Sequence, residues 1–202
     1  VVRMLSRLVG EQAFFKGCTH YFEQHDGQAV TTDDFVSAIE HASQKDLSQF
    51  RRWYEQPGTP RIRTISRYDP ARQSFQLNMA QSNPDSLGQG RAPLQIPIAV
   101  ALFDRTGKPL KSRLNGASEP AHEHLLDFTN PEQGFHFEGV ESEPIVSFLR
   151  GFSAPVIVET DLPDADLAVL AGFDNDPFSR WDAGQTLARK EILRWMGVGN
   201  TT

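Results

Sequence analysis

Cysteine is nearly absent from this chain of 202 residues, which contains only Cys18. A single cysteine excludes an intramolecular disulfide. Because Cys18 falls on the apolar stripe of a helical pattern, we predict a buried and unreactive thiol. No apolar run approaches the roughly 20 residues that span a bilayer, so we expect no membrane partner. These features favour a reducing, cytoplasmic location.

Basic side chains are also scarce. The chain has 20 Lys and Arg against 26 Asp and Glu, and its formal net charge is -6. A protein that binds nucleic acid needs a basic patch to neutralise phosphates. The adjacent pair Arg51–Arg52 lies beside Trp53 in a helical pattern and is most simply a solvated face. We therefore expect no nucleic-acid partner.

The sequence lacks the motifs of a self-contained active site. A zinc peptidase needs H-E-x-x-H on a helix, but "AHEHLLDF" has Leu126 where the second histidine would stand. His122 and His124 would share one face of a strand and need a third ligand from elsewhere, so we predict solvent-facing histidines beside a turn. "GQGRAP" at 88–93 precedes a strand and cannot place a phosphate at a helix N-terminus. We assign no catalytic, substrate-binding or metal residue.

The first part of the chain has a helical period. Thr31 can cap a helix that follows it, with Asp33 and Asp34 in the first turn, where the helix dipole favours acidic groups. Gly27 suits the end of the preceding helix, over residues 11–25. That preceding helix has one apolar stripe, which consists of Phe14, Phe15, Cys18, Tyr21 and Phe22.

The stretch "DLSQFRRWYEQPGTP" at 46–60 predicts a helix that stops abruptly. Asp46 is a good N-cap, and the apolar side chains that follow recur at helical spacing. Pro57, Gly58 and Pro60 prevent the helix from continuing. We interpret Trp53 as packing this helix onto the next part of the chain, and Gly58-Thr59-Pro60 as setting the direction of exit.

From about residue 61 to residue 160 the apolar period changes to two, the period of a strand. Pro97 inside one such strand predicts an edge or a bulge there, and "DRTGK" at 104–108 predicts a hairpin turn. About seven short strands with frequent turns indicate an antiparallel β-sandwich. The inward residues of this alternation include Phe75, Leu77, Met79, Ile96, Ile98, Val100, Leu102, Phe135 and Phe137.

The helical period returns after about residue 161. Asp176 followed by Pro177 is a strong helix start. We interpret Asp174 as a capping residue too. The fold class is therefore a multi-part α+β protein, in which an antiparallel β-sandwich is flanked by α-helices at both ends.

Three blocks, in this order, resemble the bacterial zinc aminopeptidase N family, of the membrane-alanyl aminopeptidase type among the gluzincins. The first contains "YFEQHDGQAVTTDDFV" and the spacing of Trp53, Gln56, Gly58 and Pro60, which matches the family's Trp-x-x-Gln-x-Gly-x-Pro pattern. The second, "EGVESEPIVSFLRGFSAPV", is similar to the end of the family's β-domain. The third, "NDPFSRWDAGQ", is similar to an early segment of its C-terminal helical domain.

The resemblance implies three parts of a larger enzyme. Residues 1–58 would be the helical end of a thermolysin-like catalytic domain, 59–160 the β-sandwich domain, and 161–202 the start of an all-helical domain. The parent would be a zinc metalloaminopeptidase that removes N-terminal amino acids from peptides. None of the family's catalytic or zinc-binding motifs matches a position here, so we expect this chain alone to be inactive and without a cofactor. The alternative is a non-catalytic β-sandwich scaffold or interaction module.

The helices at both ends carry apolar faces that the rest of the chain is too small to cover. We expect these faces to pack, in the parent, against catalytic and C-terminal domains outside this chain. The side chains concerned are Phe14, Phe15 and Phe22 at one end, and Trp181, Ile192 and Trp195 at the other.

Overall fold

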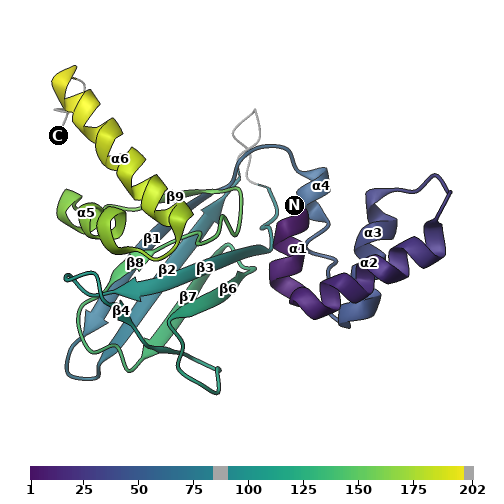
Figure 1. The fold of residues 1–202 in the computed structure, drawn as a ribbon, viewed down its shortest axis with the longest axis horizontal. Coiled ribbons are helices and arrows are strands. Elements are labelled where there is room, and N and C mark those ends of the chain that lie inside the picture. The colour runs from purple at the N-terminus through teal and green to yellow at the C-terminus, as the bar shows by residue number, and fades with distance from the viewer. Residues whose placement is uncertain (84–90, 198–202) are drawn as a thin grey trace.

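The computed structural model describes residues 1–83 and 91–197. A β-sandwich separates two groups of helices, with the N-terminal group on one side and the C-terminal pair on the other (Figure 1). The N-terminal group comprises α1 (Val2–Val9), α2 (Glu11–His25), α3 (Thr32–Ser43) and α4 (Arg52–Glu55). The C-terminal pair comprises α5 (Asp164–Phe173) and α6 (Pro177–Trp195).

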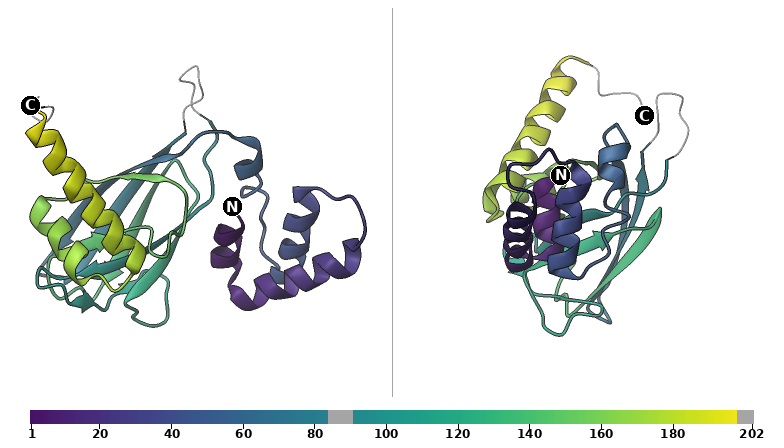
Figure 2. Two further views of the ribbon diagram at one scale, coloured as in Figure 1. Left: turned by 45° about the horizontal axis from the view of Figure 1, so that its top comes forward. Right: turned by 90° about the vertical axis from the view of Figure 1, so that its right-hand side faces the viewer.

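Helices α2 and α3 form a hairpin that projects away from the sandwich (Figure 2). Gly17 allows their close approach, because a Cβ at this position would lie 2.6 Å from Cδ1 of Ile39. The predicted cap of α3 is confirmed as a capping box, in which the backbone N–H of Thr31 donates to Oδ2 of Asp34 over 2.7 Å. The prediction for Cys18 is only partly right, because its side chain packs on the core but is half-buried.

The helix predicted from Asp46 is shorter than expected. Residues 48–51 form turns, and α4 begins only at Arg52. The carboxylate of Asp46 accepts from the backbone N–H of Ser48 over 2.8 Å, a local turn that competes with a helix start. Leu47 and Phe50 are nevertheless fully buried, at 1% and 0% exposure, so the apolar spacing identified the core residues correctly.

Within residues 1–83 and 91–197, nine strands form the two sheets of the sandwich. The first sheet has the order β5-β7-β2-β1-β9. In the second sheet, β3 is central and pairs with β4, β6 and β8. All pairs are antiparallel except β1 with β9, which run parallel. The strands are β1 (Arg61–Asp69), β2 (Ser74–Ser82), β3 (Ile96–Phe103), β4 (Pro109–Leu110), β5 (Arg113–Leu114), β6 (Glu123–Phe128), β7 (Glu132–Glu138), β8 (Ile145–Ser147) and β9 (Ile157–Glu159).

The interior of the sandwich contains the side chains that the alternation predicted. Phe137 is fully buried, and its ring centroid lies 5.9 Å from that of Phe75 on the neighbouring strand. The predicted hairpin turn is confirmed, with Gly107 at φ 87° between β3 and β4. The predicted loop at 88–93 lies in part outside the described residues.

The prediction of an edge or a bulge at Pro97 is not borne out, because β3 is the central strand of the second sheet and pairs with β4, β6 and β8. Ala99 directs its N–H to Oγ of Ser153 and its carbonyl to the backbone N–H of Arg150, both away from β6. Pro97 has the same parity along the strand, so its backbone nitrogen also faces away from β6. The missing N–H of Pro97 therefore removes no hydrogen bond between β3 and β6.

Helix α6 starts where the sequence predicted. Oδ2 of Asp176 accepts from the backbone N–H of Ser179 over 2.8 Å, and Pro177 occupies the first turn. The apolar faces predicted to be uncovered are exposed, except for that of Phe14, which is half-buried. The exposed side chains are Phe15 (60%), Phe22 (64%), Trp181 (59%), Ile192 (53%) and Trp195 (79%).

Candidate functional site: the two junctions of the sandwich

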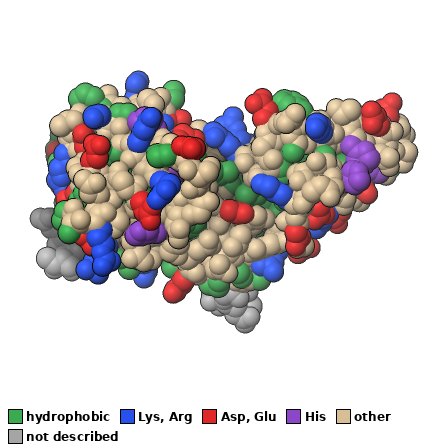
Figure 3. Space-filling view, turned by 90° about the horizontal axis from the view of Figure 1, so that it is seen from below, with side chains coloured by type: hydrophobic (Ala, Val, Ile, Leu, Met, Phe, Trp, Pro, Cys, Tyr) green, Lys and Arg blue, Asp and Glu red, His purple; other side chains and the backbone are tan. Residues whose placement is uncertain are grey.

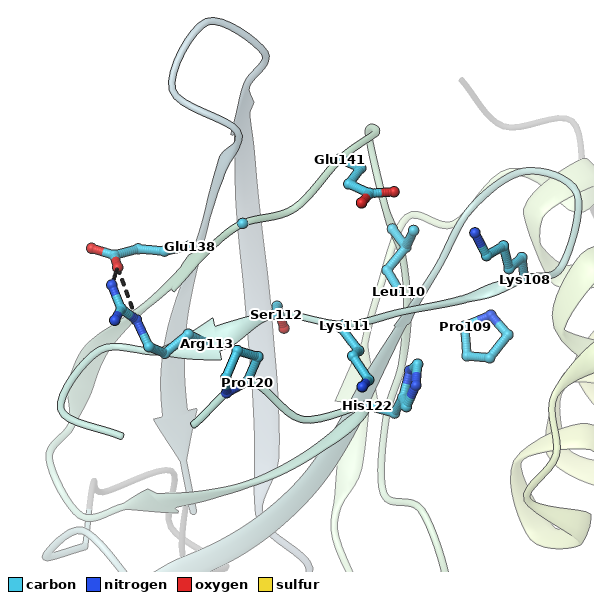
Figure 4. Close-up of a pocket in the computed structure, with 11 residues that line it drawn as sticks. Lys108, Pro109, Leu110, Lys111, Ser112, Arg113, Pro120, His122, Glu138 and Glu141 are labelled. Carbon is cyan, nitrogen blue, oxygen red and sulfur yellow. Dashed lines mark hydrogen bonds and ion pairs between the residues drawn. The ribbon is translucent and has the colours of Figure 1, made fainter. Parts of the chain in front are cut away.

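A surface pocket of about 500 Å³ lies on the sandwich beside β4 and β5 (Figure 4). Lys108, Lys111 and His122 line it together with Arg113, which forms an ion pair with Glu138. The hydrogen bonds from Arg113 lower the pKa of Glu138 below its ordinary value. Figure 3 shows acidic and basic side chains interspersed over one face of the molecule rather than gathered by sign.

The prediction for the two histidines is wrong for His124. This side chain lies on the inner face of β6 with Leu126 and Phe128, and it is only 7% exposed. Its Nε2 lies 2.9 Å from Oγ of Ser112, which is 2% exposed. Burial lowers the pKa of His124, so the ring is neutral at pH 7. A serine and a histidine buried this deeply cannot reach a substrate, and their hydrogen bond satisfies two polar groups in the core.

Within residues 1–83 and 91–197, no group of three or more His, Cys, Asp and Glu side chains is arranged to hold a metal ion. Over the same residues, no helix is both long and apolar enough to cross a bilayer. The candidate functional site consists of the two junctions between the sandwich and its helices.

The N-terminal junction is formed by hydrogen bonds from α4 and the turn before it to backbone carbonyls of the sandwich. Nε1 of Trp53 donates to the carbonyl of Gln95 over 2.7 Å. A guanidinium nitrogen of Arg52 donates to the carbonyl of Pro93 over 2.6 Å, so this side chain is not simply solvated. The interpretation that Trp53 packs its helix onto the sandwich is confirmed. The chain leaves the junction at Gly58, which has a φ of 109°, a conformation that favours glycine.

The C-terminal junction is centred on Arg150, which follows β8 and is 5% exposed. Its Nε donates to Oε2 of Glu123 on β6 over 2.8 Å. Its Nη1 donates to Oδ1 of Asp174, and its Nη2 to Oδ1 of Asn175, both over 2.5 Å and both between α5 and α6. The guanidinium also lies 5.8 Å from the ring centroid of Phe103. One side chain therefore joins the second sheet to the link between the C-terminal helices.

The charge of Arg150 is balanced within the junction. Burial alone would lower the pKa of this guanidinium, but hydrogen bonds and ion pairs with Glu123 and Asp174 outweigh burial and raise it. Asp174 does occupy a cap position, the C-cap of α5, where its backbone N–H donates to the carbonyl of Leu170, but its carboxylate binds Arg150. Its carboxylate is 1% exposed, and it accepts from Arg150 and from the backbone N–H of Asp176. A buried carboxylate of this kind is stable only because it is paired.

Helix α1 reaches the same junction through two arginines. Nη1 of Arg3 donates to the carbonyl of Gly151 over 2.9 Å, and Nη1 of Arg7 lies 3.5 Å from Oε1 of Glu123. The backbone N–H of Gly151 donates to Oδ1 of Asp176 over 3.0 Å. The junction thus joins the N-terminal helices, the sandwich and the C-terminal helices.

Sequence reasoning did not single out Arg150 as a junction residue. The signal was present in "PIVSFLRGFSAPV", where one charged residue interrupts an apolar run. A lone charge in such a run is rarely fully buried unless it is paired. Its partners were not deducible, because Asp174 is 24 residues away along the chain.

Comparison with known protein families divides the chain into three successive matches. Residues 1–54 match the peptidase family M1 domain. Residues 58–161 match the domain of unknown function DUF3458, described as an Ig-like fold. Residues 164–202 match its companion DUF3458_C, described as ARM repeats.

Relatives of the chain carry the name aminopeptidase. The chain is 43% identical to aminopeptidase N of Escherichia coli over 188 residues, which are 93% of this chain and 21% of that protein. It is 40% identical to aminopeptidase N of Haemophilus influenzae over 195 residues, which are 96% of this chain and 22% of that protein. The chain therefore spans about a fifth of the length of these relatives.

A solved structure shares the arrangement of the whole chain. Legionella pneumophila aminopeptidase A, in complex with aspartic acid, superimposes with a TM-score of 0.82 and 27% sequence identity. The match covers 99% of this chain and 21% of that one, so it includes the sandwich and the helices on both sides. The chain belongs to the DUF3458 Ig-like family, and over most of its length it is similar to proteins named aminopeptidase N.

Proposed function

We propose that the chain is the connecting part of a zinc aminopeptidase that removes N-terminal amino acids from peptides in the cytoplasm. In this proposal residues 1–58 end the catalytic domain, 59–160 form the sandwich domain, and 161–202 begin a C-terminal helical domain. The aminopeptidase names of the relatives and the peptidase M1 match support the activity of the parent. The half-buried, unpaired Cys18 is compatible with a reducing compartment.

The observation that carries the proposal is the junction at Arg150. Contacts from α1, from β6 and from the α5–α6 link converge on Arg150 and Gly151. A part whose function is to connect must hold its neighbours in a fixed direction, and buried ion pairs provide directional contacts. In this proposal the zinc ligands of the parent lie outside this chain, because the family's zinc-binding motif matches no position of the sequence.

Two measurements test the proposal. The coding sequence upstream of Val1 should contain H-E-x-x-H with a downstream glutamate, and the full-length parent should release 4-nitroaniline from alanyl-4-nitroanilide. For the isolated chain we expect no hydrolysis of this substrate and no stoichiometric zinc in metal analysis. One equivalent of tightly bound zinc on the isolated chain would contradict the assignment. A parent without the zinc motif would leave the non-catalytic scaffold as the function.

A further inference from the structure

The backbone between β8 and β9 is unusual at the point where the three parts of the chain meet. Leu149, Gly151 and Phe152 have φ values of 54°, 60° and 52°. Glycine adopts such values freely, but leucine and phenylalanine crowd Cβ against the following carbonyl. Two non-glycine residues in this conformation within four positions indicate a segment that its surroundings hold in place.

The 149–152 segment is fastened to β3 by its backbone. The N–H of Arg150 donates to the carbonyl of Ala99 over 3.1 Å, and the N–H of Ala99 donates to Oγ of Ser153 over 3.0 Å. The N–H of Ser153 donates to the carbonyl of Leu149 over 3.3 Å and closes one turn. These bonds fix the ends of the segment but not the direction of α5 and α6.

The Arg150 side chain supplies that direction. It lies between the two strained residues and binds Glu123 on one side and Asp174 on the other. A Cβ at Gly151 would lie 2.4 Å from Nη2 of Arg7, so a larger residue here would displace the end of that side chain. Phe152 is 45% exposed, so deep burial does not hold its backbone conformation. Its ring centroid lies 5.1 Å from that of Phe178 at the start of α6.

We propose that Arg150 is a conformational latch, whose ion pairs with Glu123 and Asp174 hold residues 149–152 in this turn and thereby fix α5–α6 relative to α1 and the sandwich. When the ion pairs are lost, Leu149 and Phe152 relax to ordinary φ values. The α5–α6 pair then takes several directions while the sandwich stays folded. The latch concerns the geometry of this chain and does not depend on the activity proposed for the parent.

The test measures the distance between α6 and the sandwich in the whole chain. Spin labels are placed at Gln76→Cys on β2 and Gln185→Cys on α6, two exposed positions, in a Cys18→Ser background. We expect one narrow distance distribution in the otherwise unchanged chain. Arg150→Met should broaden it at least about twofold, as expected for a domain released from a fixed orientation.

A matched control separates the latch from ion pairing in general. Arg105 also connects the sandwich to α5, through Asp166, but its side chain is 65% exposed. Arg105→Met should therefore leave the distribution narrow, because exposed pairs contribute little. Equal broadening by Arg105→Met, or an unbroadened distribution in folded Arg150→Met, overturns the proposal.

A second variant addresses folding. If Arg150→Met does not fold, Glu123→Ala replaces it, since that side chain is 42% exposed. A folded Glu123→Ala protein with a narrow distribution would also overturn the proposal.

Discussion

The two groups of helices attach to the sandwich in different ways. Seven buried apolar residues of the N-terminal part belong to the same core cluster as the sandwich: Met4, Leu5, Leu8, Val36, Ile39, Leu47 and Phe50. Three buried apolar residues of the C-terminal pair, Leu167, Leu170 and Ala183, form a separate small cluster with Ala101, Phe103 and Ile145. Apolar burial is strong but non-directional, whereas the C-terminal end adds ion pairs that set direction. The N-terminal helices therefore share one apolar core with the sandwich, whereas the orientation of the C-terminal helices depends on directional ion pairs.

The largest effect is expected where the cores are shared. Phe50→Ala should lower the free energy of unfolding by about 3–5 kcal/mol, because Phe50 is fully buried. The N-terminal helices and the sandwich should lose stability together in denaturant unfolding. Tyr54→Ala, at a position that is 37% exposed, is the control. A sandwich transition left unchanged by Phe50→Ala would show that the two parts are independent.

A smaller and local effect is expected in the C-terminal cluster. Leu170→Ala should cost about 2–3 kcal/mol, since Leu170 is 5% exposed in a small cluster. Hydrogen exchange should accelerate in α5 and α6 and stay unchanged in β2 and β7. Leu193→Ala, at a position that is 38% exposed, should change neither. Uniform loss of protection across the strands would mean that the two clusters are one.

Asp176→Ala should lower the free energy of unfolding by about 1 kcal/mol, because it removes the N-cap side chain of α6. Burial would raise the pKa of this carboxyl, but hydrogen bonds from Ser179 and Gly151 outweigh burial and lower it. A carboxyl with a lowered pKa stabilises the fold fully above its unfolded pKa and loses that contribution as pH falls through the folded pKa. The difference in free energy of unfolding between the unchanged chain and Asp176→Ala should therefore be constant near pH 7 and vanish in strong acid. A difference independent of pH down to 2 would exclude the carboxylate as its source.

The smallest effect is expected on the uncovered face of α6. Trp195 is 79% exposed, so Trp195→Ala should change the stability of this chain by less than about 0.5 kcal/mol. Trp53→Ala should cost clearly more, because Trp53 packs on the core and donates to Gln95. Thermal unfolding of the two variants measures both effects. A large loss in Trp195→Ala would reveal a covering contact on that face.

The sequence predicted the fold from features that act locally. The period of two identified the inner face that contains Phe135 and Phe137, and Asp176 with Pro177 identified the start of α6. The same parity placed His124 with Leu126 and Phe128, but a single histidine does not show which side of a sheet is the core.

The junction was harder to predict because it depends on residues far apart in the chain. The pairing of Arg150 with Asp174 exists only once β8 and the α5–α6 link lie together. The left-handed φ of Leu149 likewise has no local sequence cue, since leucine is not a residue that favours it.

The parallel pairing of β9 with β1 places Ile157, at the start of the last strand, beside Arg61, where the chain enters the sandwich. The backbone N–H of Ile157 donates to the carbonyl of Pro60 over 2.9 Å, and neighbouring strands are separated by about 4.8 Å. The first and the last strand of the sandwich therefore begin at the same end of the first sheet. Because doubling the length of a loop costs only about 0.6 kcal/mol of closure entropy, insertions at the distal turns of the sandwich are inexpensive.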